Sequence, residues 1–214
     1  MEQRVWATVD RYVKASKLDQ AVRYLERKLR AAKSRRFDAL LGATFSNDAV
    51  RLAKSIEAFR AAQPFPVKAI YLEMNGFDIN PDRWYFDYFS YDSYDKSETD
   101  LDWLADFAIS DFPSTTLTGL EKVQKVYAWY SNRGGYKDPD AKATATYATL
   151  LVMCRFAQLI ECAVSAGAIA FSIPIVATAH DFDILPRFLP KTRARSGKPK
   201  ATSVRRKRAP RARS

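Results

Sequence analysis

Apolar residues recur every three or four positions in the first third of the chain, which predicts helices there. Val5, Val9 and Val13 begin this pattern, and residues 18–29 continue it opposite a row of arginines. We expect a second helix to begin with Asn47 as its N-cap and to end before the prolines at 64 and 66.

The period then changes from that of helices to that of strands. Residues 67–74 form a short apolar run, and residues 83–91 form an aromatic run after a turn signal at Asn80 and Pro81. We expect these two strands to pair in an antiparallel manner. Apolar and polar residues alternate over 103–109, which predicts a third, half-exposed strand.

Helical patterns return in the last third. Thr118 and Glu121 have the spacing of a capping box, so we expect a helix from there to Gly134. A longer apolar helix is predicted over residues 140–166, and a last strand over 169–179.

This order of elements predicts an α/β fold, α+β-like in its segregation, with a small mixed sheet of about four strands packed with helices. We expect residues 1–189 to be a single globular domain. From residue 190 onward Val204 is the only large hydrophobe, so residues 190–214 are predicted to be a disordered basic tail.

Charge supports this division of the chain. The formal net charge is +11, but eleven Lys and Arg and no acidic residue fall within residues 191–214, which leaves the body neutral. Charge is also unevenly distributed within the body. Residues 1–62 hold 14 basic and 7 acidic residues, whereas residues 73–111 hold 2 basic and 11 acidic residues.

Residues 162–179 lack charge and reach the lower length limit of a membrane span. They contain Gly167 and Pro174 and alternate like a strand, so we expect no membrane contact. Cys154 and Cys162 lie eight residues apart on one predicted helix, about 12 Å along its axis, which is too far for a disulfide. With no signal peptide at the start, the sequence predicts a cytoplasmic protein.

The tail is the first candidate for a function. Its cations would release counterions from a nucleic acid or another polyanion, and it has no aromatic residue that would read bases. A localisation signal or a solubilising extension is the alternative. The candidate contacts with nucleic acid are Arg193, Arg195, Lys198, Lys200, Arg205, Arg206, Lys207, Arg208, Arg211 and Arg213.

The acidic and aromatic middle is the second candidate. Aromatic rings supply rigid contact area and carboxylates select a basic partner, although some of these rings must instead belong to the core. We expect a non-enzymatic binding protein that engages a basic protein, as an immunity-type inhibitor of a toxic nuclease does. The candidate contacts are Trp84, Tyr85, Asp87, Tyr88, Tyr91, Asp92, Tyr94, Asp95 and Trp103.

The third candidate surrounds the only histidine, which follows the last predicted strand. A metal-assisted hydrolase, or a general base oriented by a carboxylate, is the corresponding enzymatic alternative; a structural histidine at a strand end is the non-functional one. The candidate catalytic residues are His180, Asp181, Asp183, Glu73 and Asp78. We assign no metal ligand and no cofactor, since the chain has no phosphate-binding glycine loop and no zinc spacing, and the oligomeric state stays open.

Overall fold

The computed structural model describes residues 2–95, 101–108, 111–166 and 172–189. It confirms the α/β fold class, with five α-helices and a mixed sheet of five strands in place of about four. The predicted tail, residues 190–214, lies outside the described residues. The strands are β1 (Ala69–Met74), β2 (Tyr85–Tyr91), β3 (Thr115–Thr116), β4 (Ile175–Ala179) and β5 (Arg187–Phe188).

The sheet has the order β3-β2-β1-β4-β5. β1 pairs with β2 in the predicted antiparallel manner, and β1 and β4 are parallel neighbours. The last predicted strand is shorter than expected, because β4 begins at Ile175; part of the predicted span, residues 169–171, lies outside the described residues.

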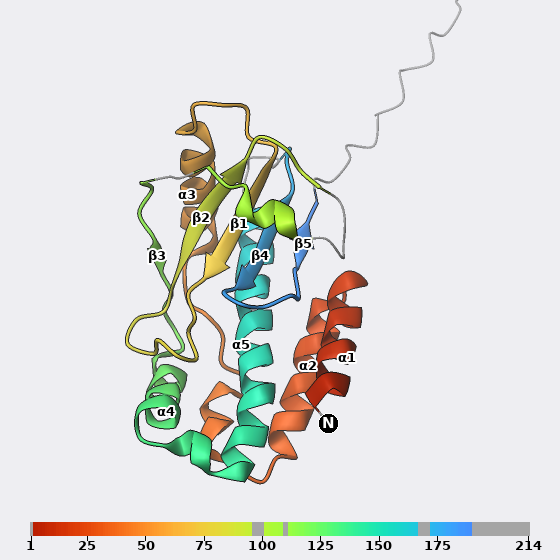
Figure 1. The fold of residues 1–214 in the computed structure, drawn as a ribbon, viewed down its shortest axis with the longest axis vertical. Coiled ribbons are helices and arrows are strands. Elements are labelled where there is room, and N and C mark those ends of the chain that lie inside the picture. Colours follow the sequence, from red (N-terminus) through yellow and green to blue (C-terminus); the bar gives the residue numbers. More distant parts are fainter. Residues whose placement is uncertain (1, 96–100, 109–110, 167–171, 190–214) are drawn as a thin grey trace, which may run out of the picture.

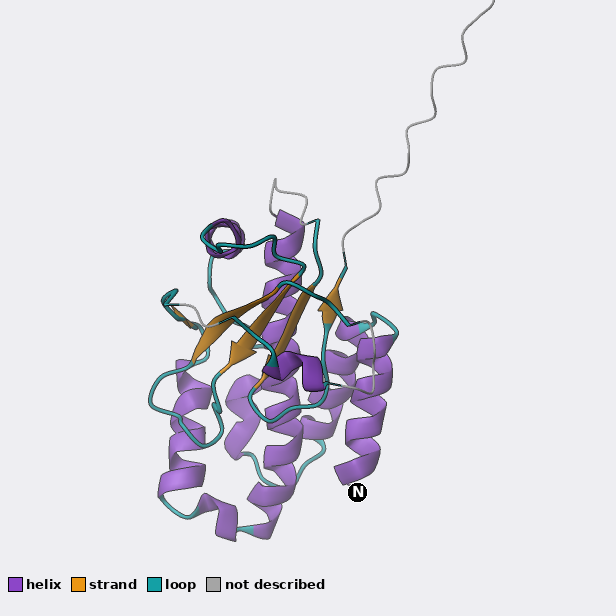
Figure 2. Ribbon diagram, turned by 45° about the horizontal axis from the view of Figure 1, so that its top comes forward, coloured by secondary structure: helices purple, strands orange, loops and turns teal. Residues whose placement is uncertain are grey.

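The helices cover one face of the sheet. They are α1 (Glu2–Lys14), α2 (Leu18–Arg30), α3 (Ala49–Ala61), α4 (Glu121–Asn132) and α5 (Pro139–Ala166), with short 3₁₀ helices η1 (Arg36–Leu40), η2 (Asp102–Ala105) and η3 (Gly135–Lys137). In Figure 1, α3 and α5 lie behind the strands, whereas η2 lies in front of them. Figure 2 shows the same arrangement from a second direction, with α4 and the lower half of α5 extending beyond the sheet.

The main core forms where the helices meet the inner face of the sheet. Alternate strand residues such as Ile70, Leu72 and Phe86 are fully buried there against α5. α5 is long and apolar enough to cross a membrane, but 61% of its most apolar window is buried inside the protein. This is consistent with the central helix of a soluble protein.

Two predicted helix starts need correction. Asp48 caps α3, because its side chain accepts the N–H of Arg51 at 2.7 Å. Asn47 instead bonds the backbone of residues 116 and 118, far along the chain. α4 begins at Glu121, later than the capping box implies, and the Thr118 N–H is taken by Asn47. Local spacing cannot reveal such a distant partner.

The predicted third strand over 103–109 is also wrong. Residues 102–105 form η2, and in the described part of this segment only Ala108 forms a bridge, with Ser90 of β2. The ladder position beside the start of β2 is taken by β3. The alternation of the sequence reflects rings that pack on the sheet rather than a strand within it.

Candidate functional site

Two parallel strands end side by side at the candidate catalytic residues. β1 and β4 are in register from Ile70 and Ile175 to Met74 and Ala179, and the His180 N–H donates to the Met74 carbonyl oxygen at 2.9 Å. Ligand sites of open α/β sheets commonly lie beyond such carboxyl ends. The sequence order, a strand followed by His180, therefore places the only histidine of the chain at this edge.

His180 and Glu73 form a hydrogen-bonded pair on the outer face of the sheet. The distance from His180 Nδ1 to Glu73 Oε1 is 2.7 Å, and the His180 side chain is 56% exposed. The bond to Glu73 raises the pKa of His180 above its ordinary value, and burial opposes this only in part. The pair resembles a carboxylate-oriented imidazole with its second nitrogen near the surface.

Further acids surround this pair. Asp181 Oδ1 lies 3.6 Å from His180 Nε2, and Asp181 has a left-handed backbone with a φ of 64°. Burial raises the pKa of Asp78, and the charge of Asp181 adds to that rise, so these two carboxylates are close enough to interact. Asp87 is the direct cross-strand neighbour of Glu73 and accepts the Ser114 hydroxyl at 2.5 Å.

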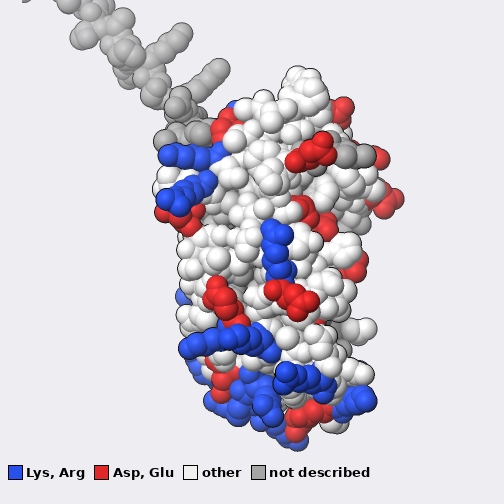
Figure 3. All heavy atoms as spheres, turned by 90° about the vertical axis from the view of Figure 1, so that its left-hand side faces the viewer, with Lys and Arg blue, Asp and Glu red and all other residues white. Residues whose placement is uncertain are grey.

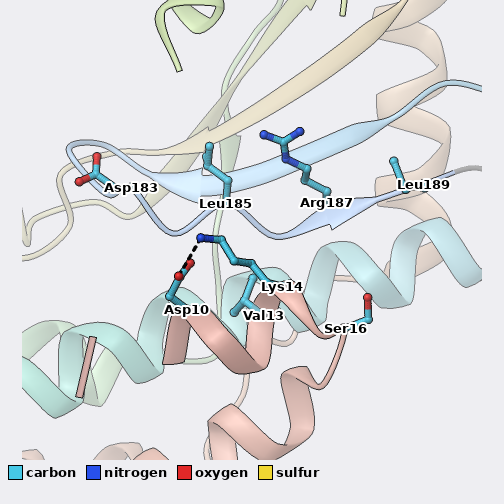
Figure 4. A pocket seen from close by; sticks show the side chains of 8 residues that line it. All are labelled: Asp10, Val13, Lys14, Ser16, Asp183, Leu185, Arg187 and Leu189. Carbon is cyan, nitrogen blue, oxygen red and sulfur yellow. Dashed lines mark ion pairs between the residues drawn. The ribbon is translucent and has the colours of Figure 1, made fainter. Parts of the chain in front are cut away.

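Asp183, by contrast, is separated from the pair. It lines a small cavity of about 140 Å³ between α1 and β5, together with Asp10 and Lys14, which form an ion pair at 2.9 Å (Figure 4). The guanidinium of Arg187 turns away from α1 there and donates to the Tyr94 hydroxyl at 3.2 Å. Within the described ranges, no three His, Cys, Asp or Glu side chains are grouped in a way that would hold a metal ion.

The aromatic residues of the second candidate divide between core and surface. Trp84 and Tyr88 are 2% and 4% exposed in the main core, and Tyr91 is 2% exposed on the outer face. These three rings belong to the packed interior and offer no area to a partner. Tyr85 follows Trp84 and points to the opposite face, because the side chains of a strand alternate between faces. It is half-buried there.

A second, smaller apolar cluster covers the outer face of the sheet. Trp103 of η2 packs edge-on against Tyr91 and Tyr94, with ring centroids 4.8 and 5.5 Å apart. The Tyr91 hydroxyl donates to the Leu104 carbonyl oxygen at 3.0 Å, which fixes η2 on the sheet. Trp103 and Tyr94 keep part of their rings at the surface.

Four exposed carboxylates lie on the same chain segment as the rings of this outer cluster. We call Asp92, Asp95, Asp102 and Asp106 the acidic face; all four are exposed. Asp92 and Asp106 form no ion pair with any described residue. In Figure 3, acidic side chains gather toward the upper right of the view, whereas Lys and Arg crowd its lower end. The charge separation along the sequence is therefore also a separation in space.

The remaining candidates are the ten cations of the tail, from Arg193 to Arg213, and they lie outside the described residues. Both cysteines are free; Cys154 is buried and Cys162 is exposed. Sequence reasoning missed Tyr71, Ser114 and Arg187, which contact Glu73, Asp87 and Tyr94 respectively. Strand alternation places Tyr71 beside Glu73, but nothing in the sequence points to the other two contacts.

No protein-family model, no curated protein and no solved structure matches this chain.

Proposed function

We propose that the protein is a non-enzymatic binding protein whose acidic face engages a basic protein partner. The observation that carries this proposal is the exposure of all four acidic-face carboxylates on the segment that covers the outer side of the sheet. Residues 73–111 include only Arg83 and Lys96 as cations, so the sequence offers this region few counter-charges. A basic surface would supply them.

The physical basis is long-range attraction followed by aromatic contact. Surface charge of one sign acts over roughly a Debye length of about 8 Å at physiological salt, and it raises association rates with oppositely charged proteins. Phe107 is 41% exposed beside the acidic face, and the partly exposed rings of Tyr94 and Trp103 add apolar area there. An immunity-type inhibitor of a basic nuclease is a protein of this kind, an analogy that rests on charge and composition.

The test is a charge reversal on the acidic face of the full chain, in the variant Asp92→Lys/Asp95→Lys/Asp106→Lys. The probe is a fluorescent 20-residue Lys/Arg peptide, and its anisotropy is measured at 50 and 300 mM NaCl. We expect the variant to bind the probe at least about tenfold more weakly at 50 mM, with a smaller difference at 300 mM because salt screens the charges.

The matched control is Asp10→Lys/Asp19→Lys, with Asp140→Lys as the third change, which alters the net charge equally outside the acidic face. We expect its affinity for the probe to fall less than about threefold. Equal losses in the two variants would show that net charge alone governs binding, and the proposal would be refuted. Circular dichroism checks that both variants are folded.

A hydrolase is the second candidate, and the 2.7 Å contact between His180 and Glu73 favours its acid-base form over its metal-assisted form. If this is the function, His180→Gln should abolish turnover of a hydrolysable substrate while the thermal unfolding midpoint is kept. If His180→Gln loses turnover only because the variant unfolds, His180 has a structural role.

Nucleic-acid contact through the tail and a cytoplasmic location are further proposals. The tail proposal rests on eleven cations in 24 residues, and shortening the chain after Leu189 tests it by the loss of DNA binding. A reducing compartment is supported by two free cysteines. Labelling of Cys162 in intact cells by a permeable thiol reagent would check that location.

A further inference from the structure

The end of the molecule opposite the acidic face collects several basic segments. Residues 27–36 and 133–142, which we call the basic end, come together although about a hundred positions separate them. Lys33 Nζ lies 3.7 Å from Asp140 Oδ1, and the Arg36 guanidinium lies 4.7 Å from the ring centroid of Trp129 on α4. Figure 3 shows this end as the densest group of Lys and Arg in that view.

The charge of the basic end is poorly compensated. Its two segments contain nine Lys and Arg and two carboxylates, Asp138 and Asp140, and two acids just outside them, Glu26 and Asp38, pair with Arg30 and Arg35. Asp138 accepts the N–H groups of Asp140 and Ala141 at 2.9 and 3.2 Å, which occupies it as the cap of α5, and Asp140 lies beside Lys33. The remaining cations keep a surplus of positive charge for an outside anion.

Two of the arginines are held in place by the fold. Arg35 donates through Nη1 to the Arg30 carbonyl oxygen at 3.0 Å, and its Nε lies 2.7 Å from Asp38 Oδ2. Arg36 is stacked on Trp129. A guanidinium that is already fixed loses less side-chain entropy on binding an anion. Residues 33–36 border a surface depression of about 340 Å³ with Asp138 and Asp140.

The rings at this end indicate the chemistry of the partner. Tyr136 is 51% exposed, and it is the only large exposed hydrophobe among the described residues of the basic end. A membrane surface is favoured by several apolar side chains that insert together, which this end lacks. Cations that follow a backbone beside an exposed aromatic ring are typical of surfaces for single-stranded nucleic acid.

We infer that the basic end binds the phosphate backbone of single-stranded nucleic acid, with Tyr136 stacking on a base. Lys33, Arg35 and Arg36 contact phosphates. This site differs in position and in sign of charge from the acidic face, and it does not depend on the proposed function. It is also a different part of the chain from the tail, residues 190–214.

The experiment measures binding of the full-length protein to a 5′-labelled 24-nucleotide single strand by fluorescence anisotropy between 25 and 200 mM NaCl. The test variant is Lys33→Gln/Arg35→Gln/Arg36→Gln. Each lost phosphate contact reduces the slope of log Kobs against log salt by about 0.7 for a single strand, so we expect a reduction of about 2. Tyr136→Ala should weaken binding about fivefold or more, with a smaller effect on a duplex of the same sequence.

The matched control is Lys54→Gln/Lys122→Gln/Lys125→Gln, which removes the same charge from exposed positions on α3 and α4. We expect its slope to stay within about 0.5 of the unaltered protein. An unchanged slope in the test variant would mean that the tail alone binds the strand, and an equal reduction in the control would mean that only net charge matters. Either result overturns the inference.

Binding to vesicles with anionic lipid is measured for the same variants. If the test variant loses vesicle binding and keeps its DNA slope, the basic end is a membrane surface and the inference is likewise overturned. Thermal unfolding followed by circular dichroism confirms that every variant is folded, so a loss of binding reports on the surface.

Discussion

Replacement of Trp84 by alanine should destabilise the protein severely. Trp84 is 2% exposed, and its ring centroid lies 5.3 Å from that of Phe77 and 5.8 Å from that of Tyr127. Its indole N–H donates to the Phe77 carbonyl oxygen at 3.0 Å. A large aromatic residue of this kind costs about 3–5 kcal/mol when it is truncated to alanine in a core.

This loss is a large fraction of the free energy of unfolding, which is about 5–15 kcal/mol for a typical protein. For a chain of this length each kcal/mol corresponds to about 2–4 °C in the unfolding midpoint, so we expect a decrease of about 6–20 °C. Trp84→Phe keeps most of the ring but leaves the Phe77 carbonyl oxygen without its donor, and we expect a smaller loss of about 1–3 kcal/mol.

The assay is urea unfolding followed by far-ultraviolet circular dichroism, with Tyr85→Ala as the control. Tyr85 is the next residue along the chain, points to the opposite face and is half-buried beneath Arg83, whose guanidinium lies 5.0 Å from the ring centroid. We expect Tyr85→Ala to cost less than about 1.5 kcal/mol. Equal costs for the two neighbours, or the reverse order, would refute the assignment of Trp84 to the core face.

Three further predictions concern the histidine pair, a glycine and the cysteines. Because the bond to Glu73 raises the pKa of His180, Glu73→Gln should lower that pKa in a proton NMR titration, where the only histidine of the chain gives one pair of imidazole C–H signals. The sign follows: the stability that this bond contributes is present at low pH and is lost as the pH rises through the folded-state pKa of His180. Gly119→Ala should lower the free energy of unfolding by more than the about 1–3 kcal/mol of a strained backbone, because φ is 101° and the added Cβ would lie 2.7 Å from backbone atoms; Gly42→Ala, at φ 72° with nothing within 4 Å of the Cβ, should show the backbone cost alone. Cys162 should react with a thiol reagent in the folded protein, whereas Cys154, whose pKa burial raises to about 12, should react only in denaturant. Mass spectrometry of the labelled peptides measures the order, and earlier labelling of Cys154 would contradict this prediction.

The sequence by itself determined the fold class, because helical and strand periods are local properties that survive whatever the chain packs against. Two strand-like runs with a turn signal between them also predicted the antiparallel pairing of β1 and β2. The separation of charge along the chain predicted a body with an acidic side. The basic end had a signal too, in six cations within residues 27–36 without an acid. That signal gained meaning only when the fold placed residues 133–142 beside it.

Tertiary structure alone decided the rest. It determined that Asp48 and not Asn47 caps α3, since Asn47 bonds residues 116 and 118. It placed the 3₁₀ helix η2 at residues 102–105, where a strand was predicted over 103–109, and Trp103 of η2 packs on Tyr91. It brought Glu73 within hydrogen-bonding distance of His180, whereas Asp183 lines the small cavity beside α1. Sequence reasoning had grouped all three. Contacts between residues a hundred positions apart depend on packing of the whole chain, and periodicity within a dozen residues carries no record of them.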